Sequence, residues 1–168
     1  STFDDGYKKR TAGSNAFKFY VDKCMGGKKG FRNTFPIPEN DAYLRKAYRG
    51  GFTYVAPQYK NKLVGAGRVY DVNSLYPFAL HSPHVYPYGE PVYFTGEYQK
   101  NDKYPLYFQR FYCDFKLKPD HLPTIQMKNT AGYIPTEYVT ESLNDSVPLT
   151  LTSVDLALFF DQYDVYNY

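Results

Sequence analysis

The residue with the clearest chemical potential is an aspartate at a change of secondary structure. Asp71 lies near the end of a β-prone run, residues 68–72, and residues 74–80 can begin a helix with Pro77 inside its first turn. We therefore expect Asp71 at a strand-to-helix corner, where metal-binding and catalytic carboxylates often collect. Helix caps and surface carboxylates occupy such corners more often, so the residue type alone assigns no site.

Three other groups of residues carry less chemistry than their types suggest. Ser74 is expected to be the N-cap of that helix and not a nucleophile, because no histidine stands in a fixed relation to it to act as a base. His81 and His84 are three residues apart, but Pro83 between them breaks the helical geometry that a shared metal would need. Residues 65–67, Gly-Ala-Gly, precede a strand instead of following one, which argues against a dinucleotide-binding loop.

Helix and loop signals stand at the start of the chain. The sequence predicts a helix that is capped by Ser14, has apolar residues at helical spacing and ends at the glycine pair 26–27. Residues 28–41 are rich in Lys, Gly, Pro and Asn and predict an extended linker. Cys24 and Cys113 are far apart in the sequence, so they indicate neither a disulfide framework nor a zinc site, and we interpret both as reduced core residues.

Strand signals dominate the second half of the chain. Residues 106–117 predict one long strand with alternate residues on one buried face. Shorter strand candidates are residues 124–128, 137–140 and 149–151. Ser153 can cap a final helix that reaches Tyr163, and residues 165–168 look like the beginning of one more strand. The expected fold class is α+β, with a mostly antiparallel β part and two or three helices.

The composition describes a globular chain with an uneven distribution of charge. Hydrophobic residues make up 43% and aromatic residues 20% of the chain, which argues against disorder. No stretch approaches the roughly 18 apolar residues of a membrane span, and the first residues lack a signal-peptide layout, so we expect a soluble, cytoplasmic protein with no membrane partner. Residues 1–70 hold 14 Lys and Arg against 5 Asp and Glu, whereas residues 71–168 hold 6 against 12. The basic half is a candidate surface for phosphates, although basic runs are usually just solvated surface.

Two sequence motifs resemble those of family B DNA polymerases. Residues 71–77, Asp-Val-Asn-Ser-Leu-Tyr-Pro, resemble the first catalytic motif of that family. Residues 48–51, Tyr-Arg-Gly-Gly, resemble a motif of its protein-primed branch, which is found in small bacteriophages and adenoviruses. Further stretches similar to the phage members are residues 11–14, 87–91, 122–126 and 153–156. Over nearly its whole length, the chain is therefore similar to a piece of a protein-primed DNA polymerase.

The resemblance implies a metal and nucleotide site around Asp71. In such enzymes two Mg²⁺ ions stabilise the attacking 3′-oxygen and the leaving pyrophosphate. By resemblance, Asp71 is the catalytic carboxylate and a metal ligand, and the backbone carbonyl of Val72 is a second metal ligand. The incoming deoxynucleoside triphosphate would contact Val72, Asn73, Ser74, Leu75 and Tyr76, with the Tyr76 ring packed under its sugar. A single aspartate holds Mg²⁺ weakly without substrate phosphates, so we expect no occupied metal site in this chain alone.

The resemblance also implies contacts with DNA and with a priming protein. Primer-template DNA would contact Tyr48, Arg49, Gly50, Gly51 and Lys128. The implied segments are residues 1–47, a helix and linker after an exonuclease domain; residues 48–83, part of the palm; residues 84–161, the insertion called terminal protein region one; and residues 162–168, a return strand to the palm that is cut short. Relatives use the insertion to dock the priming protein, called the terminal protein, and its acidic bias suits a basic partner.

Several motifs that polymerisation requires do not occur in this sequence. They are the later tyrosine-x-aspartate-threonine-aspartate motif, a lysine that binds the triphosphate and the motifs of the proofreading exonuclease. We therefore expect the chain to be inactive alone, although its parent would be a DNA-directed DNA polymerase of a phage or mobile element, acting in the host cell. Two alternatives remain: a free-standing nucleic-acid-binding module, and a protein-interaction domain that recruits a priming protein.

Overall fold

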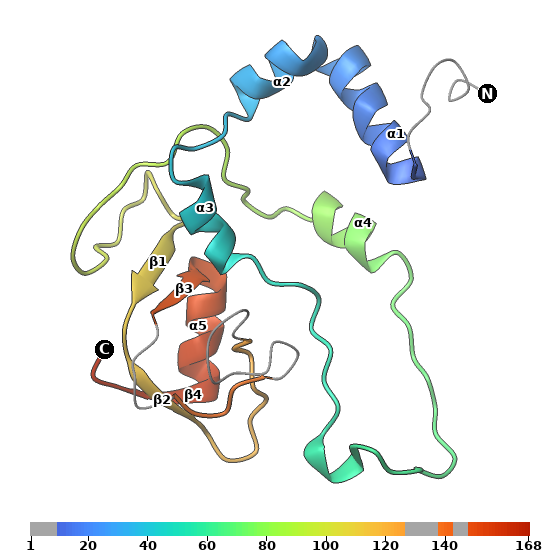
Figure 1. Cartoon of the computed structure of the whole chain (residues 1–168), viewed down its shortest axis with the longest axis vertical. Helices are drawn as coiled ribbons and strands as arrows, with labels where there is room; N and C mark the ends of the chain where they lie inside the picture. The colour runs from blue at the N-terminus through green and yellow to red at the C-terminus, as the bar shows by residue number, and fades with distance from the viewer. Residues whose placement is uncertain (1–9, 127–137, 143–147) are drawn as a thin grey trace. The chain divides into compact units, whose positions relative to one another are not determined.

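The architecture is α+β, as the sequence predicts. The computed structural model describes residues 10–126, 138–142 and 148–168 (Figure 1). The chain divides into two compact units, of which the first is Ser1–Asp41 with Pro87–Tyr98 and the second is Ala42–Tyr86 with Gln99–Tyr168. The regular structure described in the first unit is helical, whereas the second unit contains the strands and the longest helix.

The first helix of the chain was predicted correctly, but its cap was not. Helix α1 (Ala12–Phe19) continues into a π-helical turn, Tyr20–Cys24. The capping residue is Thr11, whose Oγ1 accepts a hydrogen bond of 3.1 Å from the amide of Ser14. Ser14 therefore lies inside the helix at the third position, which is the position whose free amide an N-cap side chain reaches.

A second helix replaces the first half of the predicted linker. Helix α2 (Gly27–Thr34) occupies residues that the composition assigns to an extended segment. Ring contacts supply the stability that local propensity lacks: Phe31 meets Phe17 edge to face with centroids 5.3 Å apart, and Phe35 lies 5.1 Å from Phe31. The prediction of a linker was wrong for residues 28–34, because contacts between aromatic rings that are distant in the sequence hold this segment as a helix despite its glycines.

The middle of the chain contains short helical elements joined by irregular segments. They are α3 (Asp41–Leu44), the 3₁₀ turns Arg45–Ala47 and Pro57–Tyr59, and α4 (Leu75–His81). The strand predicted over residues 68–72 does not form, and Val69 and Tyr70 are 98% and 83% exposed. An extended segment becomes a strand only when a neighbour supplies hydrogen bonds, and the strands of the described residues all pair with other partners.

Two small antiparallel sheets form the β part of the second unit. Strand β1 (Phe108–Phe111) pairs with β3 (Leu149–Thr152), and β2 (Asp114–Leu117) pairs with β4 (Tyr163–Tyr166). The single strand predicted over residues 106–117 is thus divided, since the chain changes partner between β1 and β2. Its predicted alternation of buried and exposed residues is nevertheless correct, because both strands contribute the same face to one core.

Some of the shorter predicted strands form only in part. The candidate at residues 149–151 is confirmed as β3, and the final strand is confirmed as β4, which begins earlier than predicted and pairs with β2. The candidates at residues 124–128 and 137–140 meet in one bridge between Gln126 and Tyr138, and parts of both lie outside the described residues.

Helix α5 (Ser153–Gln162) covers the sheets and is held at both ends. Its cap is Thr152 instead of Ser153: the Thr152 hydroxyl accepts from the Asp155 amide at 3.1 Å and donates to the Asp155 carboxylate at 2.8 Å. At the other end, Lys118 Nζ donates to the carbonyls of the last helical turn at 2.9 and 2.8 Å. A cation at that place also complements the negative end of the helix dipole.

Tyr163 lies at the centre of the core of the second unit. It was predicted within the last helix, but it is the first residue of β4 and only 1% exposed. Its hydroxyl donates to the carbonyl of Val139 at 2.8 Å and accepts from the amides of Thr124 and Ile125 at 2.9 and 3.3 Å. The buried residues around it are Phe111, Cys113, Phe115, Ile125, Val139, Leu149, Leu151, Leu156 and Phe159.

Among the described residues, no helix has the length and apolar character that crossing a membrane requires.

Removing the Tyr163 hydroxyl tests this arrangement of the core. In Tyr163→Phe, two buried amides and a carbonyl lose their partner, so we expect the free energy of unfolding to fall by about 1–3 kcal/mol. Urea denaturation followed by circular dichroism measures this change. Tyr166→Phe removes the same group from a residue that is 53% exposed and serves as the control. An equal loss in both variants would contradict the role given to Tyr163.

The two cysteines should differ sharply in reactivity. Cys113 is buried as predicted, whereas Cys24 is exposed and was wrongly interpreted as a core residue. Burial, with a smaller contribution from the charge of Asp114, raises the pKa of the Cys113 thiol to about 11. Because the thiolate is the reactive form, we expect iodoacetamide at pH 8 to modify Cys24 in the native protein and Cys113 only after unfolding, as mass spectrometry of the labelled peptides can verify.

The same pKa shift predicts a pH dependence of stability. The raised pKa means that the native state holds the Cys113 proton more tightly than the unfolded state, whose thiol titrates near its usual value of 9.0. The resulting stabilisation is complete below about pH 9 and is lost as the pH rises through about 11. The stability difference between the natural chain and Cys113→Ala should therefore shrink from pH 8 to 11, and a constant difference would contradict the shift.

Candidate functional site

Asp71 lies on an exposed corner of the second unit, immediately before helix α4. Residues 69–72 have no regular secondary structure, Asn73 and Ser74 form the turn, and the helix follows at once. Ser74 occupies the N-cap position as predicted, but its φ of 54° places it in the left-handed region, and its side chain makes no capping hydrogen bond. The corner was thus predicted correctly as a turn into a helix, although an irregular segment stands where a strand was expected.

Helix α4 begins directly at the turn. Its first backbone hydrogen bond runs from the amide of Phe78 to the carbonyl of Ser74 at 2.9 Å. Pro77 stands in the first turn, where the missing amide hydrogen costs nothing because those amides have no partner within the helix. The backbone of the corner is therefore defined by local sequence, and the side chains around it remain open to solvent.

The tyrosine of this corner meets the glycine pair of residues 50–51. Tyr76 is 72% exposed, and a Cβ atom built on Gly51 would lie 3.5 Å from its hydroxyl oxygen. The two motifs that the sequence singles out, which are about 25 residues apart along the chain, are thus neighbours in the second unit. Because glycine has no side chain, the space beside the Tyr76 ring stays open to a flat ligand group or a sugar.

Arg49 differs from the exposed residues on either side of it. Its guanidinium donates to the carbonyls of Lys46 at 2.8 Å, Tyr48 at 3.4 Å and Thr150 at 3.3 Å. Burial lowers the pKa of this guanidinium, and the nearby carboxylate of Asp155 acts in the opposite direction. The guanidinium of Arg49 therefore binds mainly to backbone carbonyls of the second unit.

The chain that follows the glycine pair rests on aromatic residues. Phe52 packs on Tyr138 with centroids 5.0 Å apart, and Tyr54 meets the same ring edge on at 6.3 Å. The hydroxyl of Tyr138 accepts a hydrogen bond of 3.2 Å from the amide of Thr53. A pocket of about 190 Å³ lies beside these contacts, with Arg49 and Asp155 among its lining residues.

Not all predicted site residues come together. Tyr48 is 75% exposed and stands next to the glycine pair, but Lys128 lies outside the described residues. Within the described ranges, no cluster of three or more His, Cys, Asp or Glu side chains can hold a metal ion, so neither the pair His81 and His84 nor Asp71 belongs to such a cluster.

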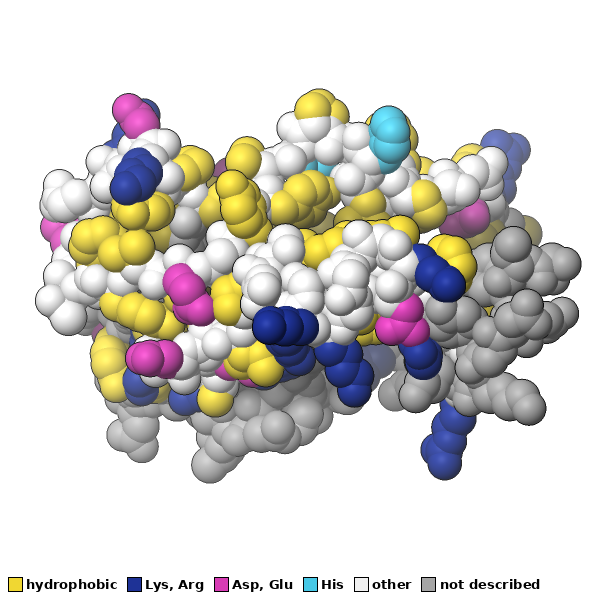
Figure 2. Space-filling view, turned by 90° about the horizontal axis from the view of Figure 1, so that it is seen from above, with side chains coloured by type: hydrophobic (Ala, Val, Ile, Leu, Met, Phe, Trp, Pro, Cys, Tyr) yellow, Lys and Arg dark blue, Asp and Glu magenta, His cyan; other side chains and the backbone are white. Residues whose placement is uncertain are grey.

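The hydrophobic residues near the corner are unusually open. Figure 2 shows hydrophobic side chains reaching the surface among the polar ones. Those on and beside the corner include Val69, Tyr70, Val72, Leu75, Tyr76, Phe78 and Leu80, each at least 49% exposed. Exposed hydrophobic residues that follow one another so closely in the sequence make this corner a candidate contact site.

Sequence reasoning missed the residues that hold the glycine pair in place. Arg49 was noticed for its charge only, and neither Tyr138 nor Asp155 was singled out. Thr150, which binds Arg49, stands 101 residues away along the chain. Such a contact leaves no periodic signal in a single sequence, whereas the motif around Asp71 is local and therefore visible.

Comparison with known proteins gives a consistent result. The family of type B DNA polymerases of organelles and viruses matches residues 3–167. The DNA polymerase of Bacillus phage Nf is 44% identical over 98% of this chain, and that of Streptococcus phage Cp-1 is 32% identical over 96%. The structure of phi29 DNA polymerase with primer-template DNA and incoming nucleotide superposes with a TM-score of 0.84 at 41% identity, covering 99% of this chain.

The match covers only part of each relative. The chain spans 29% of the Nf enzyme, 30% of the Cp-1 enzyme and 29% of the phi29 polymerase chain. Identity above 40% with coincident backbones leaves no room for a chance likeness, and the expected resemblance is confirmed. The chain belongs to the type B DNA polymerases of organelles and viruses, in the protein-primed group that includes the phi29 enzyme.

Proposed function

We propose that this chain contributes one corner of a DNA polymerisation site, with Asp71 as its catalytic carboxylate. The observation that carries the proposal is the proximity of Gly51 to the hydroxyl of Tyr76, five residues after Asp71 in the sequence, in a chain whose structural relative is a polymerase bound to primer-template DNA and nucleotide. Nucleotidyl transfer needs a carboxylate that can hold a metal ion, and Asp71 is exposed. The exposed ring of Tyr76, just after the turn, is available to the nucleotide.

Mg²⁺ fits the donors available at the corner. The carboxylate of Asp71 and the backbone carbonyl of Val72 are hard oxygen ligands, the type that Mg²⁺ prefers. The ion supplies Lewis-acid stabilisation of the charge on the reacting phosphate oxygens. Asp71 would hold the ion at a fixed place, and a two-metal site would require further carboxylates from a motif that this sequence does not contain.

The incoming deoxynucleoside triphosphate is the ligand proposed for the residues after Asp71. In this proposal Asn73, Ser74 and Leu75 shape the nucleotide pocket and Tyr76 packs its ring under the sugar. The high exposure of the Tyr76 ring supports this role, because a core tyrosine would be covered by its own chain. A ring in that place discriminates by shape, since a 2′-hydroxyl group would collide with it.

DNA is the second proposed partner. Tyr48, Gly50 and Gly51 would approach the template backbone, where the absence of a Cβ atom allows close contact. Lys128 stays a predicted DNA contact, whereas the hydrogen bonds of Arg49 to three backbone carbonyls favour a different role for its guanidinium. The exposed residues Arg45 and Lys46 just before this segment add positive charge to it.

The insertion, residues 84–161, is proposed to dock a priming protein. In this proposal residues 84–161 form the insertion, between the partial palm of residues 48–83 and the strand of residues 162–168, and residues 1–47 link to an exonuclease domain. Residues 71–168 hold 6 Lys and Arg against 12 Asp and Glu, and this acidity suits a basic protein better than DNA.

Two observations separate this proposal from the alternatives. A free-standing nucleic-acid-binding module would bind DNA with an affinity that falls steeply with salt and does not depend on Asp71. A protein-interaction domain would bind a priming protein equally well after Asp71→Ala. Neither alternative explains why the exposed corner carries a complete seven-residue catalytic motif.

The isolated chain should not extend a primer. It contributes one of the carboxylates that the reaction needs, so a primer-extension assay with 10-fold excess chain, Mg²⁺ and all four nucleotides is expected to give no product above background. The phi29 enzyme under the same conditions is the positive control. Any extension product that disappears with Asp71→Ala would contradict the prediction.

Asp71 should be essential once the rest of the enzyme is present. In a chimera that carries this segment in place of the matching segment of the Nf polymerase, Asp71→Asn is expected to lower the incorporation rate by about 10³-fold or more, since a metal ligand is worth several kcal/mol. Asp102→Asn makes the same charge change at an exposed loop residue and should have little effect. Comparable activity of the two variants would contradict the role of Asp71.

A further inference from the structure

Arg49 forms a bridge between two segments that are distant along the chain. One arm of its guanidinium, Nη1, binds the carbonyls of Lys46 and Tyr48, and the other arm, Nη2, binds the carbonyl of Thr150 in β3. The planar fork of an arginine can hold several acceptors at fixed angles, which a lysine ammonium cannot do. Arg49 thereby joins the start of the glycine-pair segment to the sheet.

The surroundings of Arg49 favour a role inside the protein. Its Nε atom is buried and has no hydrogen-bond partner among the described residues, and burial lowers the pKa of the guanidinium, partly offset by Asp155. Asp155 is itself fixed by the capping hydroxyl of Thr152 at 2.8 Å. The three carbonyl contacts, at 2.8, 3.4 and 3.3 Å, direct the guanidinium toward backbone acceptors of its own chain.

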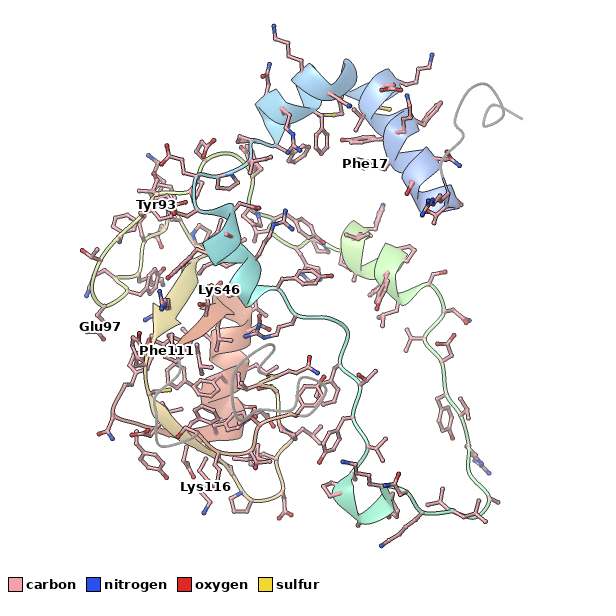
Figure 3. The ribbon with its side chains drawn as sticks, viewed as in Figure 1. Phe17, Lys46, Tyr93, Glu97, Phe111 and Lys116 are labelled. Atoms are coloured by element: carbon pink, nitrogen blue, oxygen red, sulfur yellow. The ribbon has the colours of Figure 1, made fainter. Side chains whose placement is uncertain are left out.

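Neighbouring contacts hold the same segment at other points. The 3₁₀ turn Arg45–Ala47 packs against β3, and Ala47 is 1% exposed; Lys46 on this turn is labelled in Figure 3. On the other side of the glycine pair, the Thr53 amide donates to Tyr138 and Phe52 packs on the same ring. The segment is therefore fixed before and after the glycines, which themselves are exposed.

We propose that Arg49 is a positioning residue that fixes the Tyr48–Gly51 segment to β3, and that it does not bind template phosphates. The significance of this role for catalysis rests on the function proposed above. The glycines stay free for close approach, while their place relative to Tyr76 is set by the sheet of the second unit. Damage to the Arg49 bridge would then displace the glycine pair without removing a cation that contacts a phosphate.

The variant Arg49→Lys separates the two roles because it keeps the charge and loses the fork. Hydrogen exchange of the Thr53 amide in the chain without substitutions reports on the position of the segment without any DNA. We expect Arg49→Lys to accelerate this exchange by about 10-fold or more, and Tyr138→Phe, which removes the acceptor itself, gives the rate of an undocked segment. Arg68→Lys, at an exposed arginine, is the matched control and should leave the rate unchanged.

DNA binding by the same variants gives the second measurement. A positioning role predicts that Arg49→Lys and Arg49→Gln weaken binding of a primed 30-mer template to similar extents, with the slope of log affinity against log salt unchanged. A phosphate contact predicts that Arg49→Lys binds normally and that Arg49→Gln loses about 0.9 from the magnitude of that slope. Normal exchange and normal binding in Arg49→Lys would overturn the proposal.

The two measurements also distinguish this inference from the proposed function. If the natural chain shows no salt-dependent binding to DNA, the proposed template contact fails, and the exchange rate of Thr53 alone decides the role of Arg49. If the natural chain binds DNA but Arg49→Lys leaves the Thr53 exchange unchanged, the positioning role fails and the template contact stands.

Discussion

The second unit depends on one buried hydroxyl group. Tyr163 stands where helix α5 passes into β4, and its hydroxyl satisfies two amides and one carbonyl of segments that make few ladder hydrogen bonds with each other. Two-stranded sheets are marginally stable by themselves, so a small β structure needs such a tie between its loops and its helix. The rings of Phe115 and Phe159 pack around Tyr163 at 5.3 and 5.1 Å, and this aromatic cluster gives the rest of the unit a fixed support.

The corner that carries Asp71 is built in the opposite way. Its shape comes from a turn and a short helix, while Val72, Leu75 and Tyr76 find little cover in the described part of the chain. A catalytic group must be open to substrate, whereas exposure of the hydrophobic side chains next to it forgoes the favourable free energy of burying apolar surface. The polymerase relatives are more than three times as long as this chain, and we infer that their additional residues cover the equivalent surface.

Local and distant interactions explain which predictions were correct. The α+β class, the alternation within residues 106–117, and the helices α1, α4 and α5 follow from periodicity and turn chemistry, which a single sequence displays directly. The missed helix α2 depends on the contact of Phe31 with Phe17, and the missing strand at residues 68–72 depends on an absent neighbour. Both errors concern partners that local sequence does not specify.

The same distinction governs the candidate site and the meaning of its charge. The motif around Asp71 is contiguous and was recognised at once, but the position of the glycine pair depends on Arg49 and on acceptors in β3. Counting charges along the sequence assigns Arg49 to a surface for phosphates. Its hydrogen bonds show that the half-buried guanidinium orders backbone carbonyls of its own chain. A basic segment can therefore serve a nucleic acid in two ways, through cations that contact phosphates and through cations that hold the contacting backbone in place.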